Sequence, residues 1–285
     1  MTPLQYGRVG ALGFDPMEKK PLYHFRPGEP IFSVASRGCN LHCAFCQNWG
    51  LSQDADGAAE DMTPAEVVAM AVEHGSGGIA YTYSEPLVWF EFVRDTARLA
   101  HEAGLVNVAV TNGFIEPGPL AELTPLLDAA NVDLKSMDDR FYRRVCKARL
   151  DPVLNTIRTL HGAGVHVEVT NLVIPGYNDA PEDIAALAGF VASVGRGVPL
   201  HLSAYRPAWK FDAPPTPPST LARAARIAAS MLDYVYQGNV AAPGAMDTKC
   251  AYCGAPAVER SASGVRSHLD EDGACRRCSH VVVKV

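Results

Sequence analysis

Three cysteines share one short loop, RGCNLHCAFCQNW, with the spacing C-x3-C-x2-C: Cys39, Cys43 and Cys46. Cysteine thiolates are the usual ligands of iron-sulfur clusters, and a 4Fe-4S cluster usually takes four of them. Three ligands therefore predict a 4Fe-4S cluster with one iron left open to bind another molecule. The alternatives are a three-cysteine zinc site or buried structural thiols, although zinc loops favour cysteine pairs spaced C-x2-C.

Four further cysteines form two C-x2-C pairs, Cys250 with Cys253 and Cys275 with Cys278. This spacing is typical of a zinc ribbon with four thiolate ligands. We expect zinc there, with a rubredoxin-like iron or a second cluster as the alternatives. The role is expected to be structural, because metal binding supplies folding energy to a module too small for its own core. Cys146 is interpreted as a buried thiol, with a radical or substrate role as the alternative.

The composition indicates one large domain with a small appendage. The chain has 285 residues, of which 48% are hydrophobic, and a net charge of -6. That charge argues against a dedicated nucleic-acid or anionic-membrane binder. The sequence has no signal-peptide pattern and no apolar run of about 18 residues, so a cytoplasmic protein without a membrane partner is expected. In such a protein, grouped cysteines indicate metal rather than disulfides.

Strand-like and helical segments alternate along most of the chain. A capping box from Thr63 to Glu66 opens one predicted helix, and Asp151 with Pro152 is expected to start another in the same way. Alternation of this kind predicts a parallel α/β sheet with helical crossovers. Six such units with a closing strand fit a partial barrel, and a doubly wound sheet is the alternative. The predicted strands are 31–36, 78–84, 105–110, 131–134, 165–174, 199–205 and 233–237.

These elements divide the chain into three predicted parts. Residues 1–30 form an irregular leader packed on the barrel, residues 31–240 form the partial barrel, and residues 244–285 form the four-cysteine module. The proline-rich stretch 207–218 cannot be an internal strand and is expected to be a loop near the mouth of the barrel.

Polar residues follow several predicted strands at their C-terminal ends, where parallel barrels assemble their active sites. We therefore expect them to line one pocket. Asp133 and Lys135 share a strand face, and a structural ion pair is the alternative for them. For Glu85 the alternative is an acid favoured at a helix start. The residues at these strand ends are Ser84, Glu85, Pro86, Asn112, Gly113, Asp133, Lys135, Thr170 and Asn171.

Alternation along 165–170 predicts three valines toward the helices, and His166, Glu168 and Thr170 toward the barrel interior. A polar interior suggests a ligand there. His201 and Tyr205 on the next strand are weaker candidates, each equally compatible with an ordinary core residue.

The cysteine loop, including Phe45 before its last cysteine, resembles that of the radical S-adenosylmethionine (SAM) superfamily. Across residues 14–260 the chain resembles the radical SAM enzyme of the AmmeMemoRadiSam system, a relative of pyruvate formate-lyase activating enzymes. The motifs that carry this resemblance are DPMEKKPLYHF, GCNLHCAFCQNW, IAYTYSEP, VTNG, NVDLK and LVIPGYND.

This resemblance implies a partial (β/α)6 barrel that holds one 4Fe-4S cluster, with SAM lying across the strand ends. By position, Cys39, Cys43 and Cys46 would be the cluster ligands. Phe45 would contact the adenine, and Ser84 with Glu85 would recognise the amino group of SAM. The polar residues that would line the SAM and substrate pocket are Asn112, Asp133 and Lys135.

The chain departs from its relatives at three points. Thr170 stands where activating enzymes carry arginine, and Tyr205-Arg206 stands where the family tends to have histidine after an aromatic residue. Arginine does not titrate near neutrality as imidazole does. About a dozen residues precede DPMEKKP, so the cysteine-containing stretch usual at that place in the family, with an auxiliary metal site, is not expected.

We thus expect a radical SAM oxidoreductase that receives an electron from a flavodoxin- or ferredoxin-type donor, cleaves SAM to a 5′-deoxyadenosyl radical and abstracts hydrogen from a small-molecule or protein substrate. One alternative is an activase that installs a radical on a protein partner. An alternative of another class is a metal-stabilised binding or scaffold protein. The complete cysteine set together with Glu85 argues against the scaffold.

Overall fold

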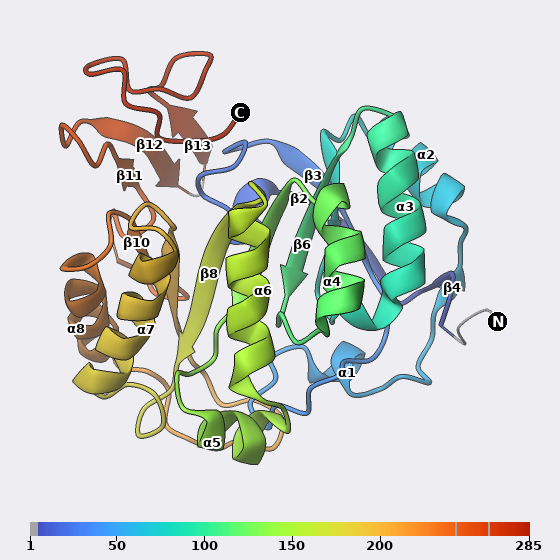
Figure 1. Ribbon diagram of the computed structural model, residues 1–285, viewed down its shortest axis with the longest axis horizontal. Helices are drawn as coiled ribbons and strands as arrows, with labels where there is room; N and C mark the ends of the chain where they lie inside the picture. The colour runs from blue at the N-terminus through green and yellow to red at the C-terminus, as the bar shows by residue number, and fades with distance from the viewer. Residues whose placement is uncertain (1–4, 243, 262) are drawn as a thin grey trace.

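The computed structural model describes residues 5–242, 244–261 and 263–285, so the first four residues of the predicted leader and residue 262 of the predicted module lie outside it. An eight-stranded sheet with the order β10-β9-β8-β7-β6-β5-β3-β2 forms its centre (Figure 1). The strands are β2 (Ala11–Pro16), β3 (Pro30–Ala35), β5 (Gly78–Tyr81), β6 (Val106–Thr111), β7 (Ala129–Asp133), β8 (His166–Val173), β9 (Leu200–Ala204) and β10 (Val235–Gly238).

Neighbouring strands from β3 to β10 are parallel, and β2 is antiparallel to β3. Each crossover moves the chain one strand further in the same direction. A doubly wound sheet would reverse its strand order at a switch point, so this order excludes that alternative and confirms the mostly parallel α/β fold of the partial barrel.

Helices follow the parallel strands and cover the outer face of the sheet (Figure 1). Val165, Val167 and Val169 pack into the same buried cluster as residues of these helices, as predicted. Within the described residues, none of the helices combines the length and apolarity that crossing a bilayer requires. The longer helices are α2 (Pro64–Glu73), α3 (Phe90–Glu102), α4 (Pro117–Leu123), α6 (Leu150–Gly162), α7 (Pro181–Val194) and α8 (Pro218–Ala229).

One helix start is confirmed and another is corrected. Thr63 and Glu66 form the predicted capping box of α2, with Glu66 N donating to Thr63 Oγ1 at 3.2 Å and Thr63 N donating to the Glu66 carboxylate at 2.7 Å. Asp151 does not cap α6, because the helix already begins at Leu150. The Leu150 N–H donates instead to Asp139 Oδ1 at 3.0 Å. A cap from a distant residue replaces the local one.

The leader is more regular than predicted. It contains β1 (Arg8–Val9), which pairs with β4 (Glu60–Asp61), then β2 and a 3-10 turn at Met17–Lys19. After that turn the chain runs inside the barrel, where Met17, Leu22 and Phe25 pack against inward residues of three strands, namely Ala80, Val108 and Ala129. The lower half of the barrel is therefore filled by the chain's own leader.

The C-terminal residues form a small antiparallel sheet of β11 (Thr248–Lys249), β12 (Pro256–Ser261) and β13 (Gly264–Ser267). Figure 1 shows this sheet and the C-terminus at the end of the molecule opposite α1 (Trp49–Ser52) and α5 (Asp139–Phe141). Tyr23 of the leader, Tyr236 of β10 and Cys250 share one buried cluster with it. The C-terminal sheet thus packs beneath the barrel, away from the C-terminal ends of the strands.

Candidate active site at the barrel mouth

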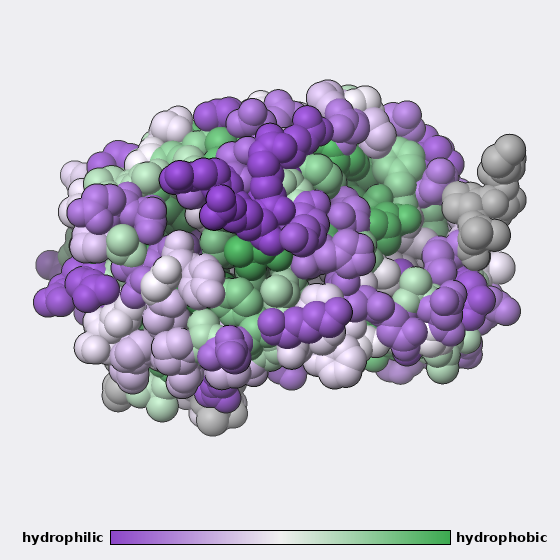
Figure 2. All heavy atoms as spheres, turned by 90° about the horizontal axis from the view of Figure 1, so that it is seen from below, coloured by the Kyte–Doolittle hydropathy of each residue, from purple (hydrophilic) through white to green (hydrophobic). Residues whose placement is uncertain are grey.

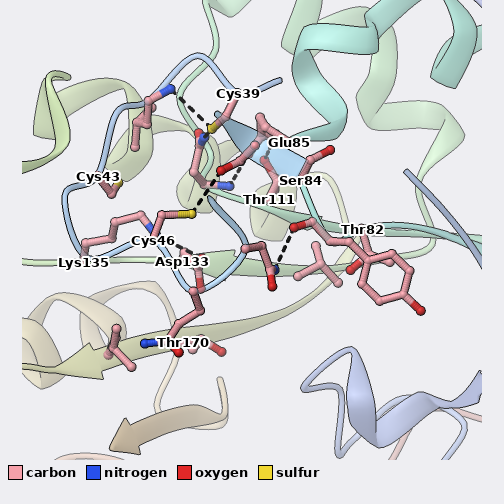
Figure 3. A pocket seen from close by; sticks show the side chains of 18 of the residues that line it. Cys39, Cys43, Cys46, Thr82, Ser84, Glu85, Thr111, Asp133, Lys135 and Thr170 are labelled. Atoms are coloured by element: carbon pink, nitrogen blue, oxygen red, sulfur yellow. Dashed lines mark hydrogen bonds and ion pairs between the residues drawn. The ribbon is translucent and has the colours of Figure 1, made fainter. Parts of the chain in front are cut away.

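A cavity of about 370 Å³ opens at the C-terminal ends of the parallel strands. Figure 2 looks onto this end of the molecule and shows apolar side chains in the middle of the face, with polar side chains around them. Figure 3 shows the cavity from close by. Of the residues that the sequence predicted for the site, those that line the cavity are Cys39, Cys43, Phe45, Cys46, Ser84, Glu85, Asn112, Asp133, Lys135 and Thr170.

The cysteine loop is attached to the chain segment that follows β7. His42 N donates to Cys146 O at 2.9 Å and Ala44 N donates to Val145 O at 3.1 Å. Both carbonyls belong to a π-helical turn at Tyr142–Cys146. These two backbone hydrogen bonds hold the middle of the loop, so that its cysteine side chains face the cavity.

The three cysteines of the loop suit a group larger than a single ion. Their sulfur atoms do not all lie within 4.8 Å of one another, in contrast to the four C-terminal sulfurs; the latter form the only such group among the described residues. Soft thiolate ligands select iron-sulfur clusters, zinc or copper(I). Three thiols, spread around one cavity wall with room beside them, fit a 4Fe-4S cluster better than a single zinc ion.

Two of the loop cysteines, Cys39 and Cys43, have a raised thiol pKa and so favour the protonated form. Burial, and then the neighbouring Glu85 carboxylate, raise the pKa of Cys39 to about 12. A hydrogen bond with Cys146, and then burial, raise the pKa of Cys43 well above its ordinary value. Metal ligation requires thiolates, so loading this loop releases protons.

Glu85 is fully buried at the wall of the cavity and accepts three hydrogen bonds. Its Oε1 accepts from Thr111 Oγ1 at 2.7 Å and from Leu87 N at 3.0 Å, and its Oε2 accepts from Asn112 N at 2.7 Å. Burial raises the pKa of Glu85 to about 7 in spite of these hydrogen bonds. Glu85 therefore caps the 3-10 turn at Pro86–Trp89 and also orients the loop after β6.

Asp133 and Lys135 lie at the end of β7, with Lys135 Nζ 3.0 Å from Asp133 Oδ2. The side chain of Asp133 is 40% exposed and that of Lys135 is 14% exposed. Although burial opposes it, the Asp133 carboxylate raises the pKa of Lys135 above its ordinary value. The Lys135 ammonium lies 5.9 Å from the centre of the Phe45 ring. This pair is open to the cavity and is not an enclosed pair in the core.

Five residues predicted for the barrel mouth do not line the cavity: Pro86, Gly113, Asn171, Cys146 and Arg206. Asn171 is buried, and its Nδ2 donates to Leu134 O at 2.7 Å. Cys146 is completely buried beside the cysteine loop, in the cluster that includes Cys43. Arg206 is exposed, and its backbone carbonyl accepts a hydrogen bond from Gln47 Nε2 at 3.0 Å. Thr170 does reach the cavity, and its hydroxyl has no hydrogen-bond partner within the described residues.

The inward-facing Glu168 of β8 forms hydrogen bonds within the protein. Glu168 accepts from His24 N at 2.7 Å, from His166 Nε2 at 3.0 Å and from His201 Nε2 at 2.6 Å. The carboxylate of Glu168 is thus satisfied by the leader and by two histidines of the sheet. Of the three residues predicted to face the barrel interior, only Thr170 lines the cavity. Tyr205 is a buried residue whose hydroxyl donates to Phe211 O at 2.8 Å.

Several lining residues were missed by the sequence analysis. Lys19 and Pro21 come from the leader and Tyr83 lies two residues before Glu85, and all three border the same cavity. The signal for the lysine was the run DPMEKKP, which precedes the barrel. Its place in the cavity depends on the reversal of the leader into the barrel, which local patterns do not reveal. Other missed lining residues are Gln47, Asn48, Ser203 and Asn239.

The four C-terminal cysteines lie together at the opposite end of the molecule. Cys250 Sγ is 3.6 Å from Cys278 Sγ, and Cys253 Sγ is 3.6 Å from Cys275 Sγ. Ligands about 2.3 Å from a tetrahedral zinc ion lie about 3.8 Å from one another. The four sulfurs, all within 4.8 Å of one another, thus match a compact tetrathiolate site.

Comparison with known proteins gives two kinds of match. The profile of the radical SAM superfamily matches residues 33–188. An uncharacterized protein of Methanocaldococcus jannaschii is 44% identical over 284 residues, which are 97% of this chain and 84% of that protein. The pyruvate formate-lyase 1-activating enzyme of Escherichia coli K12 is 26% identical over 180 residues, 61% of this chain and 73% of that enzyme.

Among solved structures, Streptococcus suis SuiB bound to S-adenosylmethionine is similar with a TM-score of 0.59. The match has 13% sequence identity and covers 78% of this chain and 53% of SuiB. At this identity the similarity concerns the fold alone.

Proposed function

The chain belongs to the radical SAM superfamily and is an enzyme, and on that premise we propose that it cleaves SAM at the barrel mouth and uses the product to abstract hydrogen from a substrate in the same cavity. The observation that carries the proposal is the convergence of Cys39, Cys43 and Cys46 with Glu85 on one cavity. A scaffold protein would have no need of a buried carboxylate beside three thiols.

We propose that Cys39, Cys43 and Cys46 hold the 4Fe-4S cluster. When bound and reduced by an external electron donor, such a cluster supplies the electron that converts SAM to methionine and a 5′-deoxyadenosyl radical. Asn112 Nδ2 lies 3.5 Å from Cys39 Sγ, and Ser52 Oγ lies 3.1 Å from Cys46 Sγ. Hydrogen bonds to ligand sulfurs tune the potential of such clusters.

SAM is assigned to the side of the cavity that Glu85 borders. The buried carboxylate of Glu85 would attract the SAM ammonium group, and the Ser84 hydroxyl, which donates to Ser36 O at 2.7 Å, can still accept a hydrogen bond. Phe45 offers a ring face to adenine. Asp133 and Lys135, an ion pair at the cavity, would contact SAM or substrate. Asn112 and Thr170 complete the polar lining.

Cys146 and Arg206 receive weaker roles. We assign Cys146 to positioning the cluster loop, because its carbonyl binds that loop and its side chain packs there. Arg206 belongs to the rim through the hydrogen bond that its backbone makes to Gln47. Neither residue is proposed to contact the reacting atoms.

The C-terminal residues 244–285 are proposed to bind one zinc ion in a structural site. Support comes from the spacing of the four sulfurs, and from the position of the C-terminal sheet at the end of the molecule opposite α1 and α5 (Figure 1). We further propose that the chain is the radical SAM member of the AmmeMemoRadiSam system and takes electrons from a flavodoxin- or ferredoxin-type protein. The ordered motifs from DPMEKKP to LVIPGYND support the first of these proposals.

Anaerobic reconstitution tests the proposal. With dithionite and SAM, the wild-type enzyme should produce 5′-deoxyadenosine, and Cys43→Ala should abolish this because the cluster loses a ligand. Ser193→Ala, at an exposed position on α7 away from the cavity, is the control and should keep the iron content. Absence of SAM cleavage by a fully loaded wild-type enzyme would exclude the proposed reaction. Deuterium transfer from a protein instead of a metabolite would favour the activase.

A further inference from the structure

We propose that one side of the cavity, lined by Lys19 and Tyr83 and supported from behind by Asp15 and Lys20, binds an anionic group of the substrate, a carboxylate or a phosphate, through Lys19. We call these four residues the Lys19 wall. The inference rests on the proposed function, since it names the substrate class of the same cavity.

The Lys19 wall is organised around one carboxylate. Asp15 accepts from the Tyr83 hydroxyl at 2.6 Å, from Lys20 Nζ at 2.9 Å and from Lys19 Nζ at 3.0 Å. Although burial opposes ionisation, these three donors hold the pKa of Asp15 well below its ordinary value. Asp15 is therefore an anion throughout the physiological pH range.

Two ammonium groups share this single carboxylate, which leaves one positive charge in excess. Within the described residues neither lysine forms an ion pair with another acid. The neighbouring Glu18 is engaged by Arg260, with Arg260 Nε at 3.2 Å from its carboxylate. Because Lys20 already neutralises Asp15, the charge of Lys19 remains available.

The two lysines differ in what they can reach. Lys20 is 1% exposed and its ammonium lies 4.6 Å from the centre of the Tyr83 ring, so it is enclosed. The Lys19 side chain is 67% exposed and lines the cavity. Lys19 can therefore leave Asp15 and meet a ligand at little cost. An ammonium group is a strong point-charge donor to phosphate and carboxylate oxygens.

One residue of the Lys19 wall, Tyr83, has an unfavourable backbone conformation. Tyr83 adopts a left-handed backbone conformation with φ of 66°, which side chains other than glycine rarely adopt. A side chain at Gly13 would meet the Tyr83 hydroxyl and displace it from its present position. A strained backbone conformation persists only where the surrounding structure holds it in place, and such residues cluster at ligand sites. Here the strain turns the Tyr83 ring over Lys20 beside the cavity.

The charges on the other walls point the substrate anion toward Lys19. The carboxylates that line the cavity are Glu85 and Asp133, which follow β5 and end β7. Asp133 already pairs with Lys135, and Glu85 is assigned to the SAM ammonium group. With both carboxylates paired, the ammonium group of Lys19 is the charge left to attract an anionic substrate.

Anion binding to the oxidised, SAM-loaded holoenzyme tests this inference without turnover. Inorganic phosphate and acetate are titrated separately by anaerobic calorimetry at constant ionic strength, with chloride as the background anion. Lys19→Gln is compared with Arg98→Gln, which removes one positive charge from an exposed position on α3. The wild-type enzyme should bind one of the two anions saturably. Lys19→Gln should raise the Kd for that anion at least about tenfold, and Lys19→Arg should restore most of the lost affinity.

The preferred anion then assigns the substrate group as phosphate or carboxylate. Equal Kd values for Lys19→Gln and the wild-type enzyme, equal losses in Lys19→Gln and Arg98→Gln, or no saturable binding of either anion would each overturn the inference. SAM cleavage is measured on the same samples. An enzyme that cleaves SAM but binds neither anion keeps the proposed function and loses only the Lys19 wall as an anion site.

Discussion

Glu85 shows how one side chain can serve both architecture and ligand binding. Glu85→Gln replaces a carboxylate oxygen by an amide N–H, which would face either Asn112 N–H or Leu87 N–H, donor against donor. We expect SAM affinity to fall by about 10- to 100-fold, because a charge-assisted hydrogen bond contributes about 1.5–3 kcal/mol. Equilibrium binding of SAM to the oxidised holoenzyme measures this.

The control for Glu85 is Glu73→Gln, at an exposed position in the last turn of α2. Because Glu85 also orders two loops, thermal unfolding without SAM is measured in parallel. Wild-type SAM affinity in Glu85→Gln would remove Glu85 from the SAM site.

Lys135→Met distinguishes a pocket residue from a scaffold residue. Removal of one member of an enclosed ion pair costs about 3–5 kcal/mol, since the other charge is stranded. Asp133 is 40% exposed, so water can solvate it when Lys135 is lost. We therefore expect a folded, cluster-loaded variant with impaired SAM cleavage or substrate turnover, measured by iron content, unfolding temperature and 5′-deoxyadenosine formation. A variant that does not fold would show that the pair holds the barrel together.

Site residues could be predicted from the sequence where they share one short motif, and could not where distant segments bring them together. The sequence alone reveals Cys39, Cys43 and Cys46, because all three belong to one C-x3-C-x2-C motif in a single loop. Lys19 and Tyr83 come together only because the leader turns back into the barrel, a contact across more than sixty residues of sequence. Similarly, the alternation of β8 placed Glu168 inward correctly, but the sequence did not reveal that His24 would occupy that interior.

At the scale of elements, the capping box of α2 allows a clean test. Thr63→Ala removes the acceptor for Glu66 N, and loss of such a cap typically costs about 1 kcal/mol of stability. Thr63 is exposed and does not line the cavity. We expect lower unfolding free energy in denaturant titrations, with unchanged iron content and SAM cleavage. A loss of cluster in this variant would mean that α2 contributes to the site in a way that its contacts do not indicate.

The parallel strands were predictable because each is a short apolar run between helical segments, and every predicted strand overlaps an observed one. The leader strand β2 was missed. Its exposed residues alternate with partly buried ones, of which Gly13 and Asp15 lie next to Tyr83. The strand contains Gly13 and ends at Pro16, and both residue types are unfavourable for a strand. Pairing with β3 overrides that preference. The start of α6 was misplaced for a related reason, since its cap comes from Asp139.

For the whole molecule we predict two metal sites of different kinds. Reconstituted protein should contain about four iron and four sulfide ions at the barrel mouth and about one zinc ion in the C-terminal module. Cys275→Ser should remove the zinc and lower stability, while iron remains. Metal analysis with thermal unfolding checks this, and Cys146→Ser is the control at a buried cysteine outside both sets. Loss of iron equal to a whole cluster in Cys275→Ser would contradict the zinc site.

His24 links the leader, β10 and the C-terminal residues, and it predicts a pH effect on stability. Its Nδ1–H donates to Val282 O at 2.6 Å and its Nε2 accepts from the Tyr236 hydroxyl at 2.6 Å, an arrangement that the neutral ring satisfies. Burial lowers the pKa of His24 to about 4. Below the ordinary pKa of about 6.5 the unfolded chain takes up a proton that the folded chain refuses. Stability from this residue is therefore complete above pH 6.5 and is lost as the pH falls toward 4.

Between pH 7.5 and 5.5 this contribution amounts to about 1.3 kcal/mol. The raised pKa of Glu85 acts in the opposite direction over the same range, so the comparison is between variants. His24→Asn should be less stable at neutral pH and should lose less stability than the wild type on acidification, by denaturant titration at several pH values. An exposed histidine, changed in His74→Asn, should leave the pH dependence intact. Parallel curves for the wild type and His24→Asn would refute this assignment.

The junction beneath the barrel also sets an order of events during synthesis. Arg26 N donates to Lys284 O at 2.8 Å and Lys284 N donates to His24 O at 2.7 Å, so residues near both ends of the sequence are joined in one short ladder. The pairing of β2 with β3 can form early in synthesis, whereas the two hydrogen bonds of His24 and Arg26 to Lys284 require residue 284 to have left the ribosome. The end of the leader around His24 and Arg26 therefore gains these two partners only after the strands of the barrel have been made. The floor of the cavity is consequently completed after the cysteine loop has already emerged, so cluster insertion and closure of the barrel can compete in time.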